Sequence, residues 1–552
     1  MPRTSRSFPL FPGALAAAAL ALSPSIGAQV AEDFKLLPLD GIDHAEFGRS
    51  SALADGLAVV GAPGDDDQGP ASGSIYIFDA ITASPRNKIV PADATAGDRF
   101  GFSVAIADGV VMAGAPFDVH AGISSGSAYV FNLATGNQIA KLVPPDGAAG
   151  DEFGFAVACE GNVAAVGAKR DDDSGTDSGS LYLFDLTTGS LLHKLLPNDG
   201  APIGNFGESV DIHGGLVAAG AHGTGFLAGA AYIFDVGTGN QLHKLLPDDS
   251  HSNMFFGTSL ALDDGLIVIG AWADSVFFDH SGSAYVFDTA TGDQLHKLVP
   301  SDGHDRDHFG YSVSIADGLV AIGAEQDGDS AFNGGSAYLF EAESGAELSK
   351  LLASDGQNFD VLGSSIAIED GILLVGAPGS DDSGDSSGSA YLFDSAGSVG
   401  TSACFGDGTG TVCPCGNSGG PGRGCANSAS ASGSVLRAYG SASILLDDLV
   451  LRARGSTPSA PGVFFQGSEA VAAGLGSVLG DGLLCAGGTI VRLEVAFANR
   501  DGSAESQTSI ASSGSVLPGQ VRHYQWWYRD SNGSPCGTGF NLSNSVQIAW
   551  VP

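Results

Sequence analysis

Aspartates are the residues of this chain whose type and spacing point most directly to a chemistry, the binding of cations. Asp171, Asp173 and Asp177 lie within one short stretch, and further aspartates recur at equivalent places along the chain. Crowded carboxylates repel one another and favour bound cations, and calcium takes about six to eight oxygen ligands from such groups. The alternative is a solvated acidic surface, which we favour because the adjacent aspartates at 171–173 cannot all point the same way.

Motifs typical of nucleophilic catalysis occur in the wrong context. Ser418 lies in Gly-Asn-Ser-Gly-Gly, where a serine-protease loop has Asp before the serine, and no histidine in a matching context precedes it. Ser124 and Ser386 lie in GxSxG motifs, but between two expected strands rather than at a strand-to-helix turn. We therefore expect no catalytic residues and no bound cofactor, calcium remaining the one candidate ion.

Composition and charge exclude several classes of partner. The chain has 552 residues, 82 of them glycine, and a formal net charge of −39. Nucleic acid and anionic membrane surfaces would be repelled by this charge. Hydrophobic residues make up 43% of the chain, which is too many for a disordered protein. Neutral sugars, cations and cationic proteins remain as candidate partners.

The N-terminus has the features of a secretory signal peptide. Arg3 and Arg6 precede an apolar stretch from Leu10 to Leu22, and small residues up to Ala28 offer a cleavage site. That stretch is shorter than the roughly 20 residues that a transmembrane helix needs, and no longer apolar run follows. We expect residues 1–28 to be removed and the mature protein to be secreted or associated with the cell surface.

Residues 34–394 consist of a repeat of about 53 residues. Each unit begins with Phe-Gly or Leu-Gly, continues with Gly-Ala fourteen residues later, and ends in a Lys-Leu segment. The Phe-Gly positions begin at Phe47, Phe100, Phe153, Phe206, Phe256, Phe309 and Leu362, and the lysines are Lys35, Lys88, Lys141, Lys194, Lys244, Lys297 and Lys350. The first lysine precedes the first Phe-Gly, and no lysine segment follows the last unit.

The pattern within one unit predicts four short strands and no helix. In the second unit we expect strands at 100–106, 110–115, 127–131 and 138–143, the first two joined by the hairpin turn Asp108-Gly109. Four antiparallel strands per unit of about 50 residues are typical of a β-propeller blade. We expect residues 29–398 to form a seven-bladed propeller in which the segment 34–38 supplies the last strand of the seventh blade and closes the ring.

The repeat resembles the FG-GAP repeat, on the residues Phe47-Gly48 with Gly61-Ala62-Pro63 and Phe100-Gly101 with Gly114-Ala115-Pro116. The resemblance implies the seven-bladed propeller of integrin α-subunit heads and of many bacterial surface proteins. Many integrin-like repeats hold a calcium loop between their first two strands. Here that connection is a tight turn such as Asp55-Gly56, so no calcium ligands carry over, and the chain is similar to the shorter bacterial version.

Residues 399–552 form a second, cysteine-rich domain that is similar to modules ending other exported bacterial proteins. Its alternating segments at 443–451, 489–497, 521–528 and 546–551 predict a small β-sandwich. An even number of cysteines in an exported chain predicts three disulfides rather than a zinc site, with 15 pairings open. We expect Cys159, in the propeller, to be a buried free thiol. The six cysteines of the domain are Cys404, Cys413, Cys415, Cys425, Cys485 and Cys536.

Two sets of aromatic residues are candidate binding sites. Tyr524, Trp526 and Tyr528 share one face of an expected strand, where a sandwich core is a better interpretation than a sugar-binding strip. The second set lies in loops of the fourth and fifth blades, where large apolar residues replace the usual carboxylates. We predict an exposed partner-binding patch there, the alternative being that the residues are covered: Phe226, Leu227, Met254, Phe255, Val276, Phe277 and Phe278.

From the sequence we expect an exported, monomeric, non-enzymatic recognition or adhesion protein whose acidic propeller face binds a protein or glycan ligand. No repeat unit has a cluster of His, Glu and Arg in its first strand, which argues against catalysis. One alternative is an extracellular hydrolase or lyase with its site in the propeller channel. Another is a scaffold that the C-terminal domain attaches to the cell envelope. Fold alone does not decide among these functions.

Overall fold

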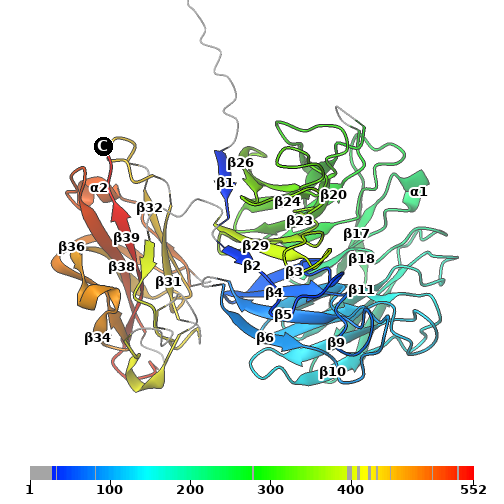
Figure 1. Ribbon diagram of the computed structural model, residues 1–552, viewed down its shortest axis with the longest axis horizontal. Coiled ribbons are helices and arrows are strands. Elements are labelled where there is room, and N and C mark those ends of the chain that lie inside the picture. Colours follow the sequence, from blue (N-terminus) through cyan, green and yellow to red (C-terminus); the bar gives the residue numbers. More distant parts are fainter. Residues whose placement is uncertain are drawn as a thin grey trace, which may run out of the picture.

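The computed structural model shows an all-β protein of two domains, a β-propeller and a β-sandwich (Figure 1). The structure describes residues 28–32, 34–80, 83–275, 279–394, 401–406, 411–419, 424–430, 433–439, 441–447, 449–499, 502–530 and 534–552. The expected signal peptide at 1–28 therefore lies almost wholly outside the described residues. No helix in the part of the chain that the structure describes has the length and apolar character needed to cross a membrane.

Seven antiparallel four-stranded sheets form the propeller, and each corresponds to one repeat unit. Blades 1 to 3 contain β3 (Ser50–Ala54), β4 (Leu57–Ala62), β5 (Ser74–Asp79) and β6 (Pro85–Ile89); β7 (Ser103–Ala107), β8 (Val110–Ala115), β9 (Ser127–Asn132) and β10 (Gln138–Leu142); and β11 (Phe153–Glu160), β12 (Val163–Ala168), β13 (Ser180–Asp185) and β14 (Leu191–Leu195). The expected seven blades and their order are confirmed.

The remaining four blades repeat this arrangement, with one short distorted helix, α1 (Thr224–Leu227), in a loop of blade 4. Their strands are β15 (Val210–His213), β16 (Leu216–Gly220), β17 (Ala231–Asp235) and β18 (Gln241–Leu245); β19 (Leu260–Asp263), β20 (Leu266–Ala271), β21 (Ser283–Asp288) and β22 (Gln294–Leu298); β23 (Phe309–Ala316), β24 (Leu319–Ala324), β25 (Ser336–Glu341) and β26 (Glu347–Leu352); and β27 (Ser365–Glu369), β28 (Ile372–Ala377) and β29 (Ser389–Asp394) of blade 7.

The N-terminal segment closes the ring, as the phase of the repeat predicts. β2 (Phe34–Leu36) is the fourth strand of blade 7 and pairs antiparallel with β29, Lys35 lying opposite Tyr391. A strand that the sequence pattern does not predict precedes it. β1 (Ala28–Ala31) runs parallel to β26 and adds a fifth strand to blade 6. The N-terminal segment therefore joins two neighbouring blades at their outer edges.

The repeated dipeptides pack neighbouring blades together. Phe47 is fully buried between blades 1 and 7, with its ring edge-on to Tyr76 at a centroid distance of 5.3 Å. A Cβ atom at Gly48, whose φ is +94°, would lie 2.3 Å from the carbonyl oxygen of Ser389 in blade 7. A Cβ atom at Gly61 would lie 2.1 Å from the carbonyl oxygen of the next blade's Gly101. Only glycine permits this close approach of backbones, so the repeated glycines fix the spacing of the blades.

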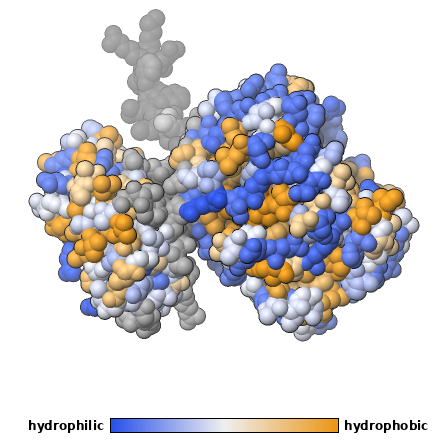
Figure 2. All heavy atoms as spheres, turned by 60° about the horizontal axis from the view of Figure 1, so that its bottom comes forward, coloured by the Kyte–Doolittle hydropathy of each residue, from blue (hydrophilic) through white to orange (hydrophobic). Residues whose placement is uncertain are grey.

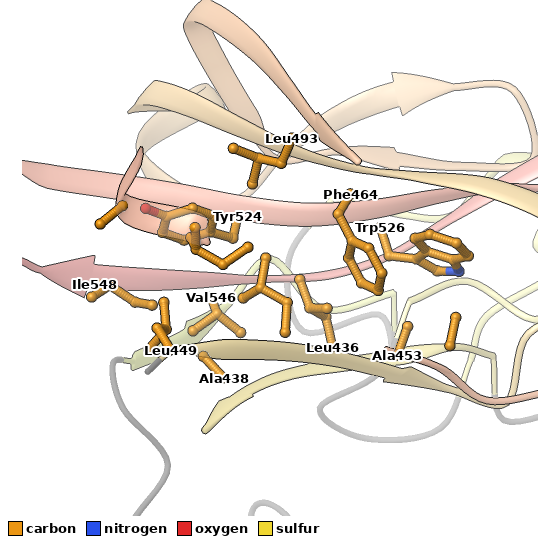
Figure 3. Packing of buried hydrophobic residues seen from close by; sticks show 14 of the residues in the cluster. Leu436, Ala438, Leu449, Ala453, Phe464, Leu493, Tyr524, Trp526, Val546 and Ile548 are labelled. Atoms are coloured by element: carbon orange, nitrogen blue, oxygen red, sulfur yellow. The ribbon is translucent and has the colours of Figure 1, made fainter. Parts of the chain in front are cut away.

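The C-terminal domain is a β-sandwich. Its larger sheet has the strand order β30 (Thr401–Ala403), β39 (Phe540–Ala549), β38 (Val521–Arg529), β33 (Pro461–Ala470) and β36 (Ala486–Phe497). Its smaller sheet contains β31 (Val435–Tyr439), β32 (Val450–Arg454) and β37 (Ala504–Glu505). A buried core that includes Phe464 and Trp526 lies between the sheets (Figure 3). The remaining short elements are β34 (Ser477–Leu479), β35 (Gly482–Leu484), η1 (Pro414–Gly416), η2 (Val471–Gly474) and α2 (Ile510–Ser513).

Two of the four strands expected in this domain have different boundaries. The segment 443–451 is not one strand, because the chain turns at 444–446 and β32 begins only at Val450. The last strand begins at Phe540 rather than at 546. Asn541, Ser543 and Ser545 obscured it, since polar residues that alternate with apolar ones on a buried strand resemble a loop. Their side chains are nevertheless buried and hydrogen-bonded, Asn541 through its amide to the carbonyl oxygen of Ala426.

The six cysteines of the C-terminal domain form three disulfides, which confirms that expectation and resolves the pairing. Cys404 is bonded to Cys485, Cys413 to Cys425, and Cys415 to Cys536. The bonds staple the irregular segment 404–425 to the rest of the sandwich. Cys159 is the free cysteine and is partly rather than fully buried, which corrects the expectation of a buried thiol. Burial nevertheless raises the pKa of its thiol to about 12, with the negative charges of Asp108 and Asp211 adding to the effect. A thiol that remains protonated at neutral pH is a poor nucleophile.

Candidate functional site

Loops and inter-blade connections emerge side by side on one face of the propeller, which we call the loop face. Each loop between the second and third strands of a blade accepts a backbone hydrogen bond from the connection that leads to the next blade. Gly150 N–H donates to Ile123 O, Ile203 N–H to Thr176 O, and Phe359 N–H to Phe332 O. The paired residues differ from blade to blade, whereas the strands beneath them repeat. The loop face is therefore where the propeller displays its individual residues.

The predicted partner-binding residues in blades 4 and 5 occupy different environments. Phe226 is 90% exposed and Leu227 half-buried at the loop tip, both with positive φ. Met254 is fully buried and cannot contribute to an exposed patch. Phe255 is half-buried and stacks on His222, with a centroid distance of 5.4 Å and an interplanar angle of 10°. Val276, Phe277 and Phe278 lie outside the described residues.

Other exposed apolar residues on the loop face were missed by the sequence reasoning. Phe332 and Phe359, 64% and 58% exposed, form an edge-to-face pair at 5.3 Å between blades 6 and 7. Ile123 and Ile203 are 76% and 60% exposed in the corresponding places of blades 2 and 3. Positive φ at a β-branched residue is strained, and Ile203 has a φ of 63°. The sequence did contain a signal for these four residues, because loop tips normally carry small or polar residues and these are large and apolar.

The acidic residues of the loop face surround the repeated lysines. Lys88 Nζ lies 2.7 Å from Asp40 Oδ2, 2.8 Å from Asp65 Oδ2 and 2.8 Å from Asp67 Oδ2, and 5.0 Å from the ring centroid of Tyr76. The seven lysines repeat this arrangement with one, two or three aspartates each, over the tyrosines Tyr391, Tyr76, Tyr129, Tyr182, Tyr232, Tyr285 and Tyr338. These Lys–Asp–Tyr clusters are a prominent feature of the loop face, and the sequence analysis did not pair the lysines with the aspartates.

The candidate calcium loop of blade 3 belongs to one of these clusters. Lys194 Nζ lies 2.9 Å from Asp171 Oδ2 and 2.5 Å from Asp173 Oδ2. Burial lowers the pKa of Lys194, but the surrounding carboxylates more than offset this effect and the pKa ends above its usual value. Asp177 lies at the loop tip with a φ of 52°, and its backbone N–H donates to Asp172. A calcium ion at Asp171 and Asp173 would therefore compete with an ammonium group already between them.

A ring of side chains that are unlike one another surrounds the propeller axis at the loop face. They occupy three repeat positions: before the Phe-Gly phenylalanine, directly after Phe-Gly, and directly after Gly-Ala. We define the axial cluster as the residues at these positions that one continuous series of contacts joins, namely Arg49, Phe102, Phe155, Lys169, Glu208, His222, Phe255, Trp272, His308, Tyr311, Glu325 and Ser364.

The cationic half of the axial cluster comes from blades 1 to 3. The guanidinium of Arg49 lies over the ring of Phe102 at 5.2 Å, and Lys169 Nζ lies 3.4 Å from the ring centroid of Phe155. The two rings contact each other, with centroids 4.9 Å apart. Lys169 Nζ also lies 3.5 Å from Glu208 Oε1 of blade 4. Two cations therefore make cation–π contacts with a pair of neighbouring aromatic rings.

The other half of the axial cluster combines carboxylates, imidazoles and aromatic rings from blades 4 to 7. His222 Nδ1 contacts Glu208 Oε2. Trp272 lies beside both Phe255 and His308, with centroid distances of 5.0 and 4.6 Å.

In blades 6 and 7, His308 Nδ1 lies 3.6 Å from Glu325 Oε1, and the hydroxyl of Ser364 donates to Glu325 Oε2 at 3.0 Å. Burial lowers the pKa of Arg49 of blade 1, but interactions that include Tyr311 and Glu325 of blade 6 more than offset this effect. Because blade 7 lies between blades 6 and 1, such interactions are possible only near the axis.

Burial shifts the titration of this cluster. It lowers the pKa of Lys169 to about 8, with the nearby Glu152 opposing the shift and the charges of Arg170 and Arg49 adding to it. It lowers the pKa of His222 to about 4, helped by the charge of Lys169. At neutral pH the imidazole of His222 is therefore neutral, and Lys169 is an ammonium group whose pKa lies near the physiological range. Perturbed groups of this kind are typical of functional sites.

The axial cluster corrects one argument made from the sequence. The expectation of no catalysis was based on the absence of His, Glu and Arg from the first strand of any single repeat. The structure brings such residues together from different blades, so that argument fails. The available signal was the exchange of Arg, Phe, Glu, Thr, Tyr and Ser at the position after Phe-Gly, in a repeat that is otherwise strongly constrained.

The opposite face of the propeller, which we call the hairpin face, carries the turns between first and second strands. His213, Asp263 and Asp264, from the turns of blades 4 and 5, have potential ligand atoms within 4.8 Å of one another, and His213 Nδ1 lies 3.4 Å from Glu160. Among the described residues this is the group with metal-ligand spacing.

The C-terminal domain contacts the hairpin face through arginines. The guanidinium of Arg454 contacts Asp317 and Asp370, and Arg437 Nη1 lies 3.5 Å from Asp394 Oδ2. The loop face points away from this contact and carries the axial cluster. Functional residues on the loop face are therefore not those that hold the two domains together.

The aromatic strand of the C-terminal domain is part of its core, as we favoured. Tyr524, Trp526 and Tyr528 are fully buried. The neighbouring Trp527 points to the opposite face of β38 and lines an apolar pocket of about 260 Å³ together with Phe465, Leu479, Leu484, Val463, Ile490, Arg492 and Leu542. Apolar patches are visible on the surface of this domain in Figure 2.

Comparison with protein families identifies the propeller repeat. The model of the FG-GAP repeat matches the chain seven times, at residues 30–78, 84–131, 137–184, 190–234, 240–287, 293–340 and 346–393. Each match spans the last strand of one blade and the first three strands of the next, in agreement with the closure by β2. No curated protein matches the chain. Because the seven matches cover more than half of its residues, the chain belongs to the FG-GAP repeat family.

Proposed function

We propose that this protein is an exported recognition protein that binds a protein or glycan ligand on the loop face of its propeller. The observation that supports this proposal most strongly is the division of residues within the repeat. Buried positions repeat from blade to blade, whereas the residues of the axial cluster and the loop tips are individual to each blade. A purely structural role gives no reason for such variety both at the axis and at the loop tips of the same face.

Exposed aromatic residues add to this proposal. Phe226, Phe332 and Phe359 place large apolar surfaces in solvent at the rim of the loop face. Clustered exposed apolar groups with charged neighbours are typical of interaction sites, and aromatic residues tend to supply the binding energy. Disulfides in the C-terminal domain are compatible with an oxidising location outside the cell.

The experiment that tests this proposal is a binding screen of the full mature chain against glycans and extracellular matrix proteins, with and without calcium. The test variant replaces Phe226 and Phe332 with Ser. Both side chains are mostly exposed, so the melting temperature should remain unchanged. The control variant replaces Leu445, an 84% exposed residue of the C-terminal domain, with Ser. Loss of binding in the test variant alone supports the proposal, and equal binding by all three proteins contradicts it.

A second candidate function is an extracellular hydrolase or lyase with its site at the axis. The contact between His222 and Glu208, beside an ammonium group of lowered pKa, is the observation that favours it. General acid–base catalysis needs groups that titrate near the working pH. Release of reducing ends or of unsaturated products from polysaccharides, abolished by Glu208→Gln, would establish this function in place of binding alone.

A further inference from the structure

We propose that the axial cluster binds the carboxylate of an acidic sugar, so that the ligand of the loop face is a uronic acid-containing glycan. This inference deepens the proposed function and rests on it. In this arrangement, Arg49 and Lys169 contact the sugar carboxylate, while Glu208, Glu325 and Ser364 receive its hydroxyl groups.

The distribution of basic residues is the first argument. The propeller has 53 acidic and 13 basic residues, and seven of the basic residues are the lysines of the Lys–Asp–Tyr clusters. Of the remaining six, Arg49 and Lys169 belong to the axial cluster, Arg99 occupies one of its three repeat positions, and Arg170 directly follows Lys169. Arg86 and Arg306 lie elsewhere. In a domain this acidic, the concentration of the unrepeated cations at one place indicates that the place receives negative charge.

The partners of these four cations separate them into two kinds. Arg99 Nη1 lies 3.5 Å from Glu46 Oε2, and Arg170 Nη1 lies 3.1 Å from Glu152 Oε1. Arg49 and Lys169 also lie over the rings of Phe102 and Phe155. Lys169 Nζ lies 3.5 Å from Glu208 Oε1, and Arg49 interacts with Tyr311 and Glu325 across the axis. An aromatic face attracts a cation weakly compared with a carboxylate. We assign the anionic ligand to Arg49 and Lys169, because each has a contact with an aromatic ring where Arg99 and Arg170 have a carboxylate.

The lowered pKa of Lys169 agrees with this assignment. Burial and the like charges of Arg170 and Arg49 disfavour its ammonium form, and Glu152 compensates only in part. A carboxylate between Arg49 and Lys169 would relieve the repulsion between the two cations and stabilise the ammonium form.

The facing wall of the cluster explains why the ligand should be a sugar. The carboxylates of Glu208 and Glu325 contact Lys169, His222, His308 and Ser364. A carboxylate has about four acceptor sites, so these contacts leave acceptor sites for a ligand. A sugar brings several hydroxyl donors to such acceptors. Aromatic rings, here Trp272 and Phe102, stack on the apolar faces of sugar rings. An aspartyl or glutamyl peptide shares the carboxylate but presents fewer donors to this wall.

Isothermal titration of the full mature chain tests the inference with a panel of oligogalacturonate, oligomannuronate and hyaluronan fragments. Neutral oligogalactose and polyglutamate are the comparison probes. We expect at least one acidic glycan to bind, with the neutral glycan and polyglutamate binding at least about 10-fold more weakly, because a charge-assisted hydrogen bond is worth more than 1 kcal/mol. Binding should weaken as the pH rises from about 7 to 10, because the ammonium group of Lys169 is then lost.

Single substitutions distinguish binding at the axial cluster from binding elsewhere on the loop face. Arg49→Gln and Lys169→Met should each raise the Kd of the acidic glycan about 10-fold or more, and Lys169→Met should remove the pH dependence. Lys169→Arg retains the charge and should retain binding, which distinguishes a binding role from a packing role if Lys169→Met is unstable. Arg306→Gln is the matched control, since Arg306 lies on the loop face but is 70% exposed and away from the axis.

Three results would overturn the inference: no binding of any acidic glycan, equal binding of the neutral glycan, or polyglutamate binding with the same dependence on Arg49. Its failure can be told apart from that of the proposed function. If a neutral glycan or a matrix protein binds in a manner that requires Phe226 and Phe332, the recognition function stands and this inference falls. If no probe requires any residue of the loop face, both fall.

Discussion

Replacing one repeated lysine in two different blades measures how much the Lys–Asp–Tyr clusters stabilise the propeller. Lys350 of blade 6 lies 2.9, 2.7 and 2.6 Å from Asp302, Asp327 and Asp329, and its side chain is 4% exposed. Lys244 of blade 4 lies 2.5 Å from Asp199 alone and is 32% exposed. The two lysines occupy the same repeat position, and their surroundings differ because the loop of blade 4 has no carboxylate. Each is therefore the control for the other.

We expect Lys350→Met to lower the free energy of unfolding by about 3–5 kcal/mol, since it leaves the buried carboxylate of Asp327 without its charge partner. Lys244→Met removes a single ion pair with a half-exposed aspartate and should cost about 0–1 kcal/mol. Guanidinium titration of the full mature chain at neutral pH, with unchanged m-values, measures both changes. The double variant Lys350→Met with Asp327→Asn should recover part of the loss.

The pH dependence of this difference is a second readout. Burial raises the pKa of Asp327, but Lys350 and Ser336 more than offset it and the pKa ends below its usual value. The wild-type protein therefore gains stability from Asp327 above about pH 4 and loses it as the pH falls through the folded-state pKa. In Lys350→Met the unpaired carboxyl should take up a proton already in mild acid, so the gap to wild type should narrow toward pH 4. Equal losses at Lys350 and Lys244, or a gap that is constant with pH, would refute the reasoning.

Three further predictions follow from the same structure. Leu36→Asp should destabilise the propeller by about 3 kcal/mol or more, because it places a charge in the core at the closing strand β2; an unchanged denaturation midpoint would show that β2 does not close the ring. Without denaturant, Cys159 should react with a maleimide far more slowly than after unfolding, because its pKa of about 12 keeps the thiol protonated; equal rates would contradict its placement. Arg454→Ala should loosen the contact between the domains, visible as a larger radius of gyration in small-angle X-ray scattering, while the melting of each domain stays within about 1 kcal/mol of wild type; an unchanged radius would show that other contacts hold the domains.

The fold of the propeller could be predicted because short, repeated sequence motifs determine how its blades pack. Phe47-Gly48 and Gly61-Ala62 place a wedge and two close backbone contacts in every blade, so counting them counts the blades. The lysine that precedes the first Phe-Gly identified the closing strand for the same reason. β1 could not be predicted, since its four residues continue the expected signal sequence and pair through their backbone with a strand more than 300 residues away.

The candidate site was less predictable because it depends on distances across the ring. Lys350 and Asp302 are 48 residues apart, and neither residue alone indicates that the aspartates of the loop face hold lysines rather than metal ions. The residues of the axial cluster are separated further, from Arg49 to Ser364, and each looks unremarkable within its own repeat. The sequence could have indicated them only by comparison of the seven units position by position, which singles out the places where the repeat tolerates any residue type.

This contrast between repeated and individual positions bears on how such a propeller could acquire the binding surface that we propose. A blade must keep its Phe-Gly, its Gly-Ala and its lysine cluster, because each contacts the neighbouring blade or fills a buried charge site. The residue directly after Phe-Gly is not constrained in this way, since its side chain points from the blade toward the propeller axis. Seven blades therefore offer seven side chains near the axis whose types differ from blade to blade. The axis is thus the place where a ring of equivalent blades can acquire a site of low symmetry, and the site that we propose there combines the cations on Phe102 and Phe155 with the carboxylates of Glu208 and Glu325.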